Sequence, residues 1–359
     1  MGVQTALDAV MTAPSIVDAL RLADDLAFEA GRDPGVRTIR VLAQALRSDD
    51  ELAAIAATHA LAQVFDGEAG RMLVGLLSDE RAFLREHAAW ALGSGLPRAD
   101  AMGALLGMVV DGGFTGMLAQ RTLERWSGAT AEQLVVGIEG ALLGIAAPEA
   151  RARLVETLGL VRHSIATVPL LRLATDAAEP DVVRIAAMAA IGQRAPDERV
   201  VDLLGAAAVG DDLIGDVARL ALVDLAASHA PEPARAEGLT IAQLFLHADI
   251  DPLLSSAGSG DNGGIATLLV RLGDALVRDG TTGVQRVITL SRGSVLEATA
   301  DLHAIRDAEY GHVYGRIPLL RDPMPSAARR IRRMPRRITT RNGHAAADGM
   351  GSRSSGMRP

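Results

Sequence analysis

The feature that most constrains the fold is a short amphipathic segment that recurs along the first two thirds of the chain. FLREHAAWALG at 83–93 and VVRIAAMAAIG at 182–192 superpose without a gap, and ELAAIAATHALAQ at 51–63 is a looser copy. In the first two, alanines occupy the positions where helices would touch, and a large apolar residue precedes a closing glycine. Such a segment cannot bury its apolar face alone, so it needs similar segments stacked against it.

The spacing of these copies predicts an α-solenoid. From residue 36 to about residue 230, short amphipathic segments are separated by Gly, Asp or Pro, and a unit of roughly 30 to 35 residues fits two short helices with their turns. Aromatic residues make up only 3% of the chain, which favours a core of Ala, Leu, Val and Ile. The signature Leu/Val-Arg-x-x-Ala-Ala-x-Ala-Leu/Ile-Gly resembles HEAT repeats of the subtype found in phycobilin lyases, a resemblance that implies a binding surface. We assign residues 1–230 to this array.

A different architecture follows the array. Two prolines in SHAPEPARAEG break the helical pattern, so residues 231–238 are predicted to form a linker. TIAQLFLHAD at 240–249 and VQRVITLSRG at 284–293 are apolar enough for buried strands, and the segment between them has the 3.6-residue spacing of an amphipathic helix. Strand, helix and strand in this order predict a parallel sheet, and therefore a Rossmann-like α/β unit over residues 239–322.

A glycine-rich loop precedes the predicted helix of this unit. Its core is Gly260-Asp261-Asn262-Gly263-Gly264, and Gly264 stands where the helix begins. Glycines let the backbone approach a ligand closely, and the free N–H groups of a helix N-terminus favour an anion. We therefore predict that this loop binds a phosphate-bearing ligand. His247 follows the first strand, where polar groups of α/β folds gather, and is a second candidate.

The same stretch resembles the start of two-domain (GT-B) retaining glycosyltransferases of the sucrose synthase and sucrose-phosphate synthase type. The resemblance rests on LTIAQLFLHADIDP, GSGDNGGIATLLVRLGDALV and GVQRVITLSRG, with HVYGRIPL at 312–319, and covers about 80 residues. It implies that Gly263 and Gly264 are loop glycines beside a nucleotide-sugar donor and a sugar acceptor. Asp261 and Asn262 would then make polar contacts, and a complete parent enzyme would transfer a hexose.

The chain lacks the rest of that enzyme type. The resemblance requires a second Rossmann-like domain with a Glu-x7-Glu pair for the donor, and nothing after residue 320 provides one. The pair Glu124 and Glu132 has the right spacing but belongs to the helical array. We therefore expect a truncated protein without its donor domain and assign no catalytic residue.

Two alternatives remain open from the sequence. The first is a non-catalytic HEAT-repeat scaffold that binds a partner protein through the helical array. The second is an NADP-binding enzyme, because residues 258–263 also satisfy G-x-G-x-x-G and Arg292 ends the second strand. This second alternative is weakened by the intervening residues 247–257, since the fingerprint should follow its strand directly.

Charge and composition narrow the class of partner. Residues 321–359 hold ten Arg and two Asp, a net charge of +8, so residues 1–320 carry −16 of the total −8. An acidic body disfavours nucleic acid, and the Arg-rich segment 323–359 is predicted to be disordered. The chain has no cysteine, no signal-like start and no 18-residue apolar run, so we expect a cytoplasmic protein without a membrane span.

Single residues within the array are expected to be structural. His59 and His87 lack a second ligand at i+4, so no metal site or cofactor is predicted. Trp90 and Trp126 are expected to fill the core of the array. Arg81, Arg85 and Arg184 are expected to be solvated or to pair with loops.

Overall fold

The computed structural model describes residues 2–227, 238–255 and 263–318. Thirteen α-helices and one short 3-10 helix form the first part of the described chain, and a three-stranded sheet with two helices forms the second. The helices of the first part are α1 (Val3–Met11), α2 (Ile16–Arg32), α3 (Val36–Ala45), α4 (Glu51–Leu61), α5 (Gly67–Leu76), α6 (Ala82–Leu92), α7 (Ala99–Asp111), α8 (Gly113–Gly144), α9 (Pro148–Leu160), η1 (Ser164–Ala166), α10 (Thr167–Thr175), α11 (Asp181–Ile191), α12 (Glu198–Ala207) and α13 (Leu213–Ala227).

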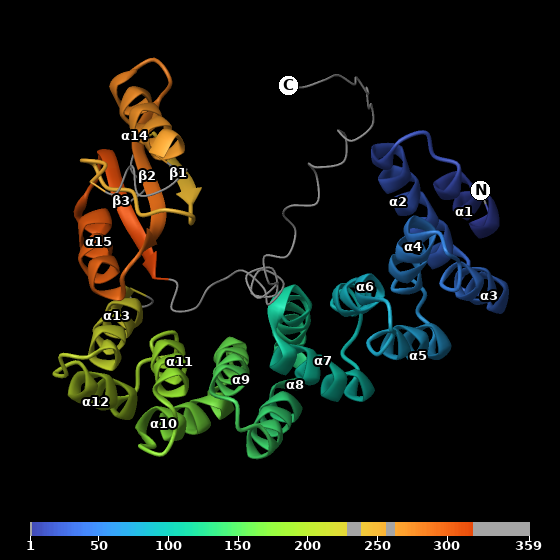
Figure 1. The fold of residues 1–359 in the computed structure, drawn as a ribbon, viewed down its shortest axis with the longest axis horizontal. Helices are drawn as coiled ribbons and strands as arrows, with labels where there is room; N and C mark the ends of the chain where they lie inside the picture. Colours follow the sequence, from blue (N-terminus) through green and yellow to red (C-terminus); the bar gives the residue numbers. More distant parts are fainter. Residues whose placement is uncertain (1, 228–237, 256–262, 319–359) are drawn as a thin grey trace, which may run out of the picture.

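These helices form a curved array of HEAT-like pairs, as the repeated segments predict (Figure 1). The helices α2, α4, α6, α9, α11 and α13 lie on the inner side of the curve, and α3, α5, α10 and α12 lie on the outer side. Each inner helix packs against the next inner helix along the array. The helix α8 has non-helical dihedral angles at Thr130, and its two halves serve as an inner helix and the following outer helix.

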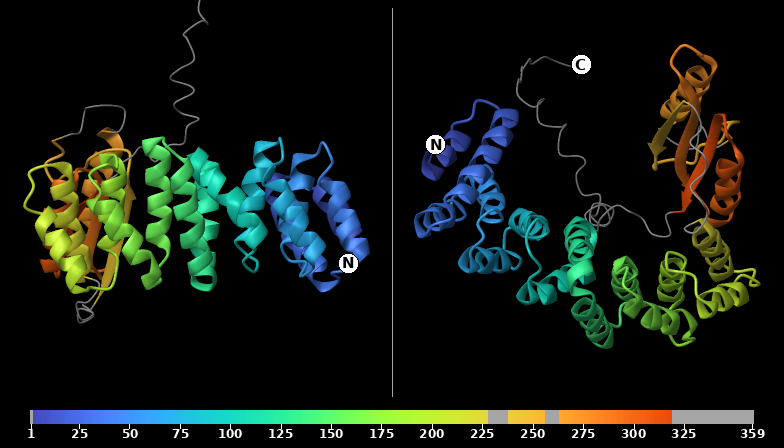
Figure 2. Two further views of the ribbon diagram at one scale, coloured as in Figure 1. Left: turned by 90° about the horizontal axis from the view of Figure 1, so that it is seen from below. Right: turned by 180° about the vertical axis from the view of Figure 1, so that it is seen from behind.

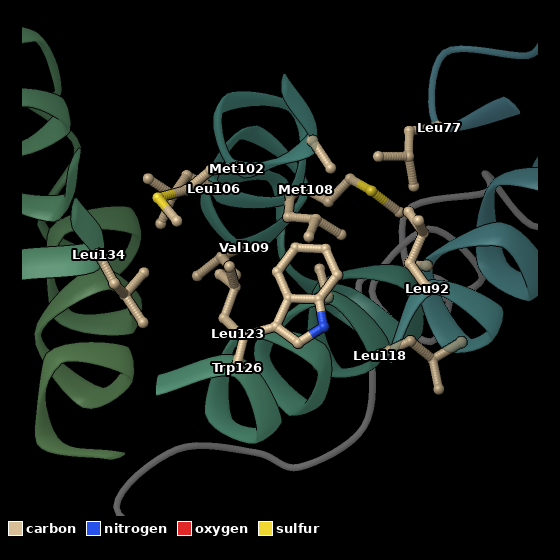
Figure 3. Packing of buried hydrophobic residues seen from close by; sticks show 14 of the residues in the cluster. Leu77, Leu92, Met102, Leu106, Met108, Val109, Leu118, Leu123, Trp126 and Leu134 are labelled. Carbon is tan, nitrogen blue, oxygen red and sulfur yellow. The ribbon is translucent and has the colours of Figure 1, made fainter. Parts of the chain in front are cut away.

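One continuous apolar core runs through the array. It is made mainly of Ala, Leu, Val and Ile, as the low aromatic content predicts. Trp126 is the largest fully buried side chain, and it packs among Leu92, Met108, Leu118 and Leu123 between consecutive repeats (Figure 3). This part of the prediction for the two tryptophans is therefore confirmed.

Arginine side chains join one repeat to the next. Arg194 is buried and donates hydrogen bonds to the carbonyl oxygens of Leu158, at 3.2 Å, and Gly159, at 2.7 Å. These carbonyls belong to the end of α9, where the last carbonyl groups of a helix have no partner within the helix. Burial lowers the pKa of Arg194 to about 10, which still leaves the guanidinium charged at neutral pH. The arginine therefore caps the helix of the preceding repeat.

The second part of the described chain is a parallel α/β unit. Its elements are β1 (Leu239–Phe245), α14 (Gly263–Arg278), β2 (Val284–Gly293), α15 (Val295–Asp307) and β3 (Gly311–Pro318), and the strand order is β1-β2-β3. The two predicted strands and the helix between them are present, and β2 has the predicted bounds. The first strand ends at Phe245 instead of Asp249, and most of its residues are exposed, so the prediction of a buried strand at 240–249 is wrong in these two respects. The predicted linker and the Arg-rich segment 323–359 lie outside the described residues, apart from Gly238.

The two helices of the unit cover opposite faces of the sheet. On one face Thr289 of β2 lies in register with Tyr314 of β3, and His312 of the same face contacts α14 through Asp274. On the other face α15 approaches so closely that a β-carbon on Gly315 would lie 2.6 Å from Ile305. The helix α15 also packs against α13, and its Val295 belongs to the core of the array. The α/β unit is thus attached to the last inner helix (Figure 2).

Candidate functional site: the inner helix ends

The predicted phosphate loop is only partly within the described residues. Gly260, Asp261 and Asn262 lie outside them, as does most of the G-x-G-x-x-G alternative, whereas Gly263 and Gly264 form the start of α14. His247 is exposed two residues after the end of β1, and its ring lies 5.5 Å from the ring of Phe245. Ligand binding by these residues, with or without a nucleotide, stays a prediction.

An arginine near the carboxyl ends of the strands is held by carboxylates. Arg316 of β3 donates from Nε to Asp249 at 2.9 Å and from Nη1 to Asp301 at 3.2 Å. Its side chain is only 15% exposed. In α/β folds this edge of the sheet is where ligands bind, so a free guanidinium here would attract phosphate. Because Arg316 is already paired with two carboxylates, it instead ties the segment after β1 and α15 to β3.

A second polar cluster lies beneath α14. Its Thr289, His312 and Asp274 are arranged like the hydroxyl, imidazole and carboxylate of a catalytic triad. His312 Nδ1 lies 2.8 Å from Asp274 Oδ1, and His312 Nε2 lies 2.8 Å from the hydroxyl oxygen of Thr289. The Tyr314 hydroxyl is 3.1 Å from the same imidazole, and burial raises its pKa to about 12. Thr289 is fully buried, so no substrate can reach its hydroxyl. We conclude that these hydrogen bonds position α14 on the sheet.

The described surface of the array carries large apolar side chains near the ends of α2, α4 and α6. Phe28 (68% exposed) lies near the end of α2, Phe65 (82%) follows α4, Trp90 (54%) lies near the end of α6, and Leu96 (77%) follows α6. The ends of α2 and α4 are neighbours, since a β-carbon on Gly31 would lie 3.2 Å from the Gln63 carbonyl oxygen, and residues after α4 and α6 line one pocket. We call Phe28, Phe65, Trp90 and Leu96 the aromatic edge.

A pocket of about 380 Å³ is lined by two residues of the aromatic edge, Phe65 and Leu96. Its apolar wall comes from the ends of α4 and α6 and from α5, with Phe65 and Leu96 among the lining residues. Phe65 and Leu96 each lie four residues after the last residue of an inner helix, so they are equivalent positions of successive repeats. Arg98 forms one wall, where its guanidinium lies against Gly70 and pairs with Asp100 at 2.7 Å.

The exposure of Trp90 contradicts the prediction that both tryptophans lie in the core. Trp90 was expected in the core, but its indole is more than half exposed. In an inner helix the sides that contact the outer helix and the neighbouring inner helices are buried, and Ala88, Ala89 and Ala91 occupy those sides of α6. Trp90 falls on the remaining side of α6, which is exposed. Phe65 and Leu96 carried no sequence signal apart from their positions in two inter-helix loops.

A pair of histidines lies on the same two inner helices. His59 Nε2 of α4 is 2.9 Å from His87 Nδ1 of α6, and the rings are edge to face at 5.1 Å. Burial, followed by the charge of His87, lowers the pKa of His59 to about 4, and burial also lowers the pKa of His87. The sequence did not reveal this contact, because the two residues are 28 positions apart. Among the described residues no cluster of three or more His, Asp or Glu could hold a metal ion.

Three of the arginines in the array behave as expected. Arg81 donates to the Leu46 carbonyl oxygen at 2.9 Å, and Arg85 donates to the Asp79 and Glu80 carbonyl oxygens at 2.6 and 3.0 Å. Arg184 lies 3.4 Å from an Asp181 carboxylate oxygen. These side chains hold the turns between outer and inner helices, so they are not available as a basic binding site.

No family model matches the sequence, and no curated protein matches it. Solved structures do match. Human deoxyhypusine hydroxylase in complex with glycerol is 18% identical and aligns over 63% of this chain and 97% of its own, with a TM-score of 0.29. The complex of CpcE and CpcF of phycocyanin lyase from Nostoc sp. PCC7120 is 15% identical over 62% of this chain and 88% of that chain, with a TM-score of 0.31.

An engineered protein is 17% identical over 63% of this chain and 96% of its own, with a TM-score of 0.29. These structural neighbours are helical repeat proteins, and they correct the resemblance to GT-B glycosyltransferases, which none of them shares. The physical reason for the error is that a strand, a glycine-rich loop and a helix recur in many α/β folds. Within the described part of the chain no helix is long and apolar enough to cross a membrane.

Proposed function

We propose that this chain is a non-catalytic scaffold that binds a partner protein through the aromatic edge of its HEAT-like array. The observation that carries the proposal is the exposure of Phe28, Phe65 and Trp90 at neighbouring helix ends in a chain with only nine aromatic residues. Contiguous exposed apolar side chains mark interaction surfaces, and aromatic residues are enriched among those that dominate binding energy.

The pocket and its surroundings have two features that are typical of protein interfaces, an apolar pocket and a polar rim. A pocket lined largely by apolar side chains, with the exposed Phe65 and Leu96 among them, can receive one apolar side chain of a partner. The ion pair between Arg98 and Asp100 lies next to it and would form part of a polar rim. Helical repeat arrays commonly use their extended surfaces in this way.

The candidate sites in the α/β unit offer less support for an enzyme. Thr289 is sealed beneath α14, and Arg316 is already paired with Asp249 and Asp301. The role that these contacts support is structural, since they hold the α/β unit together and α15 attaches it to α13.

The test is to identify the partner by crosslinking to the purified full chain and then to measure its affinity for variants. Phe65→Ala and Leu96→Ala should each weaken binding by roughly tenfold or more, because interface anchors typically cost this much when truncated. Leu143→Ala and Val209→Ala are matched controls, since both side chains are as exposed but lie elsewhere on the array. If all four variants bind the partner as tightly as the wild type, or if all four lose the same affinity, the aromatic edge is not the binding surface.

A further inference from the structure

The chain continues after the last described residue, Pro318, as a strongly basic extension. Residues 321–359 hold ten Arg and two Asp, a net charge of +8, whereas residues 1–320 carry −16. Opposite charges attract, so the extension is drawn to the rest of its own chain. We call RRIRRMPRRI at 329–338 the basic segment; it alternates pairs of arginines with Ile331, Met334 and Ile338. The basic segment can therefore offer guanidinium groups and apolar side chains to one surface.

The aromatic edge carries the complementary groups. Carboxylates lie one helical turn before Phe28 and Trp90 and shortly after Phe65, and they belong to Asp24, Asp25, Asp66, Glu68 and Glu86. A guanidinium group forms strong hydrogen bonds with a carboxylate and is also attracted to the face of an exposed aromatic ring. Aromatic rings interleaved with carboxylates thus favour arginine as the partner residue.

The arginines of the array do not neutralise this surface. Arg32 and Arg98 are each paired with a carboxylate of their own. Arg71 lies against Gly67 of the pocket wall, and Arg125 donates to a carbonyl oxygen at the end of α6 at 3.4 Å. Five carboxylates against these last two guanidinium groups leave a net charge of −3. The aromatic edge is therefore acidic, and its charge complements that of the basic segment.

The extension begins beside the array. Pro318 lies in register with Gly293 at the end of β2, and Val295, two residues further along the chain, belongs to the core of the array. The helix that contains Val295 packs against α13, and Figure 1 shows the carboxyl end of β3 close to α13. The extension therefore leaves the α/β unit at the side that is attached to the array.

The basic segment is long enough to reach the aromatic edge from there. The inner helices α13, α11, α9, α8, α6 and α4 pack in sequence, which makes five steps of about 8–10 Å each. The path to α4 is thus about 40–50 Å, and the straight line across the curve is shorter. From Pro318 to Ile331 and Ile338 the extended chain spans at most about 43 and 72 Å.

We propose that the basic segment binds the aromatic edge of its own chain and places one apolar side chain in the pocket beside Phe65 and Leu96. This inference deepens the proposed function and rests on it, because the segment and the partner protein compete for one surface. Since both sites belong to one chain, the effective concentration of the segment is on the order of 1 mM. A partner must displace the segment, so only a tightly binding partner reaches the edge.

Disulfide trapping in the full chain tests the contact, because the chain has no cysteine. The variant Ser94→Cys, Thr339→Cys places one thiol two residues before Leu96 and the other directly after Ile338. Ser164→Cys, Thr339→Cys is the control, because Ser164 is also exposed and follows an inner helix, α9, that lies closer to α13. At low salt the first pair should bridge roughly tenfold faster than the control, and about 1 M salt should abolish the difference.

The fluorescence of Trp90 gives a second test without new thiols. Acrylamide quenching reports its exposure, since the other tryptophan, Trp126, is buried. Quenching should increase at low salt in a triple variant of the basic segment, Arg330→Ala, Arg333→Ala, Arg337→Ala. The control changes the charge equally outside the segment, Arg341→Ala, Arg353→Ala, Arg358→Ala, and should follow the wild type.

Three results would overturn the inference: equal bridging rates of the Ser94 and Ser164 pairs, a bridged product that contains two copies of the chain, or equal quenching of both triple variants. None of them bears on the proposed function, which fails instead if Phe65→Ala and Leu96→Ala keep the affinity of the wild type for the partner. Fast bridging by the Ser94 pair together with tighter partner binding by the first triple variant would support both.

Discussion

Acidification should destabilise the array through His59. Burial and the neighbouring His87 lower the pKa of His59 to about 4, against 6.5 for a histidine in the unfolded chain. Above pH 6.5 the imidazole is neutral in both states and the stability is fully present. Between pH 6.5 and 4 the unfolded chain takes up a proton that the folded chain does not, so stability falls as the pH falls.

The size of this effect follows from the shift. Each pKa unit corresponds to about 1.36 kcal/mol, so a difference of 2.5 units gives a loss of about 3 kcal/mol between pH 6.5 and 4. Asp24 opposes part of the shift through its negative charge, and this contribution is already contained in the value. A loss of this size is a large fraction of the stability of an ordinary domain.

The assay is urea unfolding of the wild type and of His59→Gln at pH 7.5, 6.5, 5.5 and 4.5. The variant lacks the titrating imidazole, so its free energy of unfolding should fall less steeply with pH than that of the wild type. His303→Gln, at an exposed position on α15, serves as the control and should follow the wild type. A constant difference between the wild type and His59→Gln over the whole range would refute the reasoning.

Glycine substitutions give two further predictions. Gly192→Ala should destabilise the array by about 1–3 kcal/mol, because its β-carbon would lie 2.7 Å from the Cα of Ala221 on α13. Gly205→Ala, in open space within α12, should instead stabilise it by about 0.5–1 kcal/mol, and thermal unfolding of both variants checks the opposite signs. Gly273→Ala would place a β-carbon 2.4 Å from the His312 ring and should loosen α14 from the sheet by about 1–3 kcal/mol. Hydrogen exchange should then rise in β2 and β3 but not in α6, and unchanged exchange in the strands would count against this account.

The helical array could be predicted because its signal is local. The two segments that superpose in the sequence are the inner helices α6 and α11, and both have buried alanines where neighbouring helices touch. A small side chain at a contact and a large one before a turn are visible in a few consecutive residues. A local signal also predicted β2, since its centre is the apolar, β-branched stretch VITL between polar residues.

The burial of individual side chains was predicted less well, because it depends on packing between distant segments. The apolar spacing in α14 correctly predicted a helix, but Leu268 and Leu272 are exposed, whereas Ala266 and Val270 are buried. Periodicity marks an apolar stripe without specifying which part of it meets the sheet. The His59–His87 contact and the pocket beside Phe65 arise from the stacking of repeats, which no single segment contains.

The attachment of α15 to α13 bears on how the array ends. A stack of repeats could in principle continue at either end, because its terminal helix presents the same apolar flank that every internal helix uses to hold its neighbour. Here Val295 of α15 fills that flank with a residue from a different fold. The α/β unit thereby caps the described array. It shields the surface onto which another repeat, or the array of another molecule, would otherwise pack.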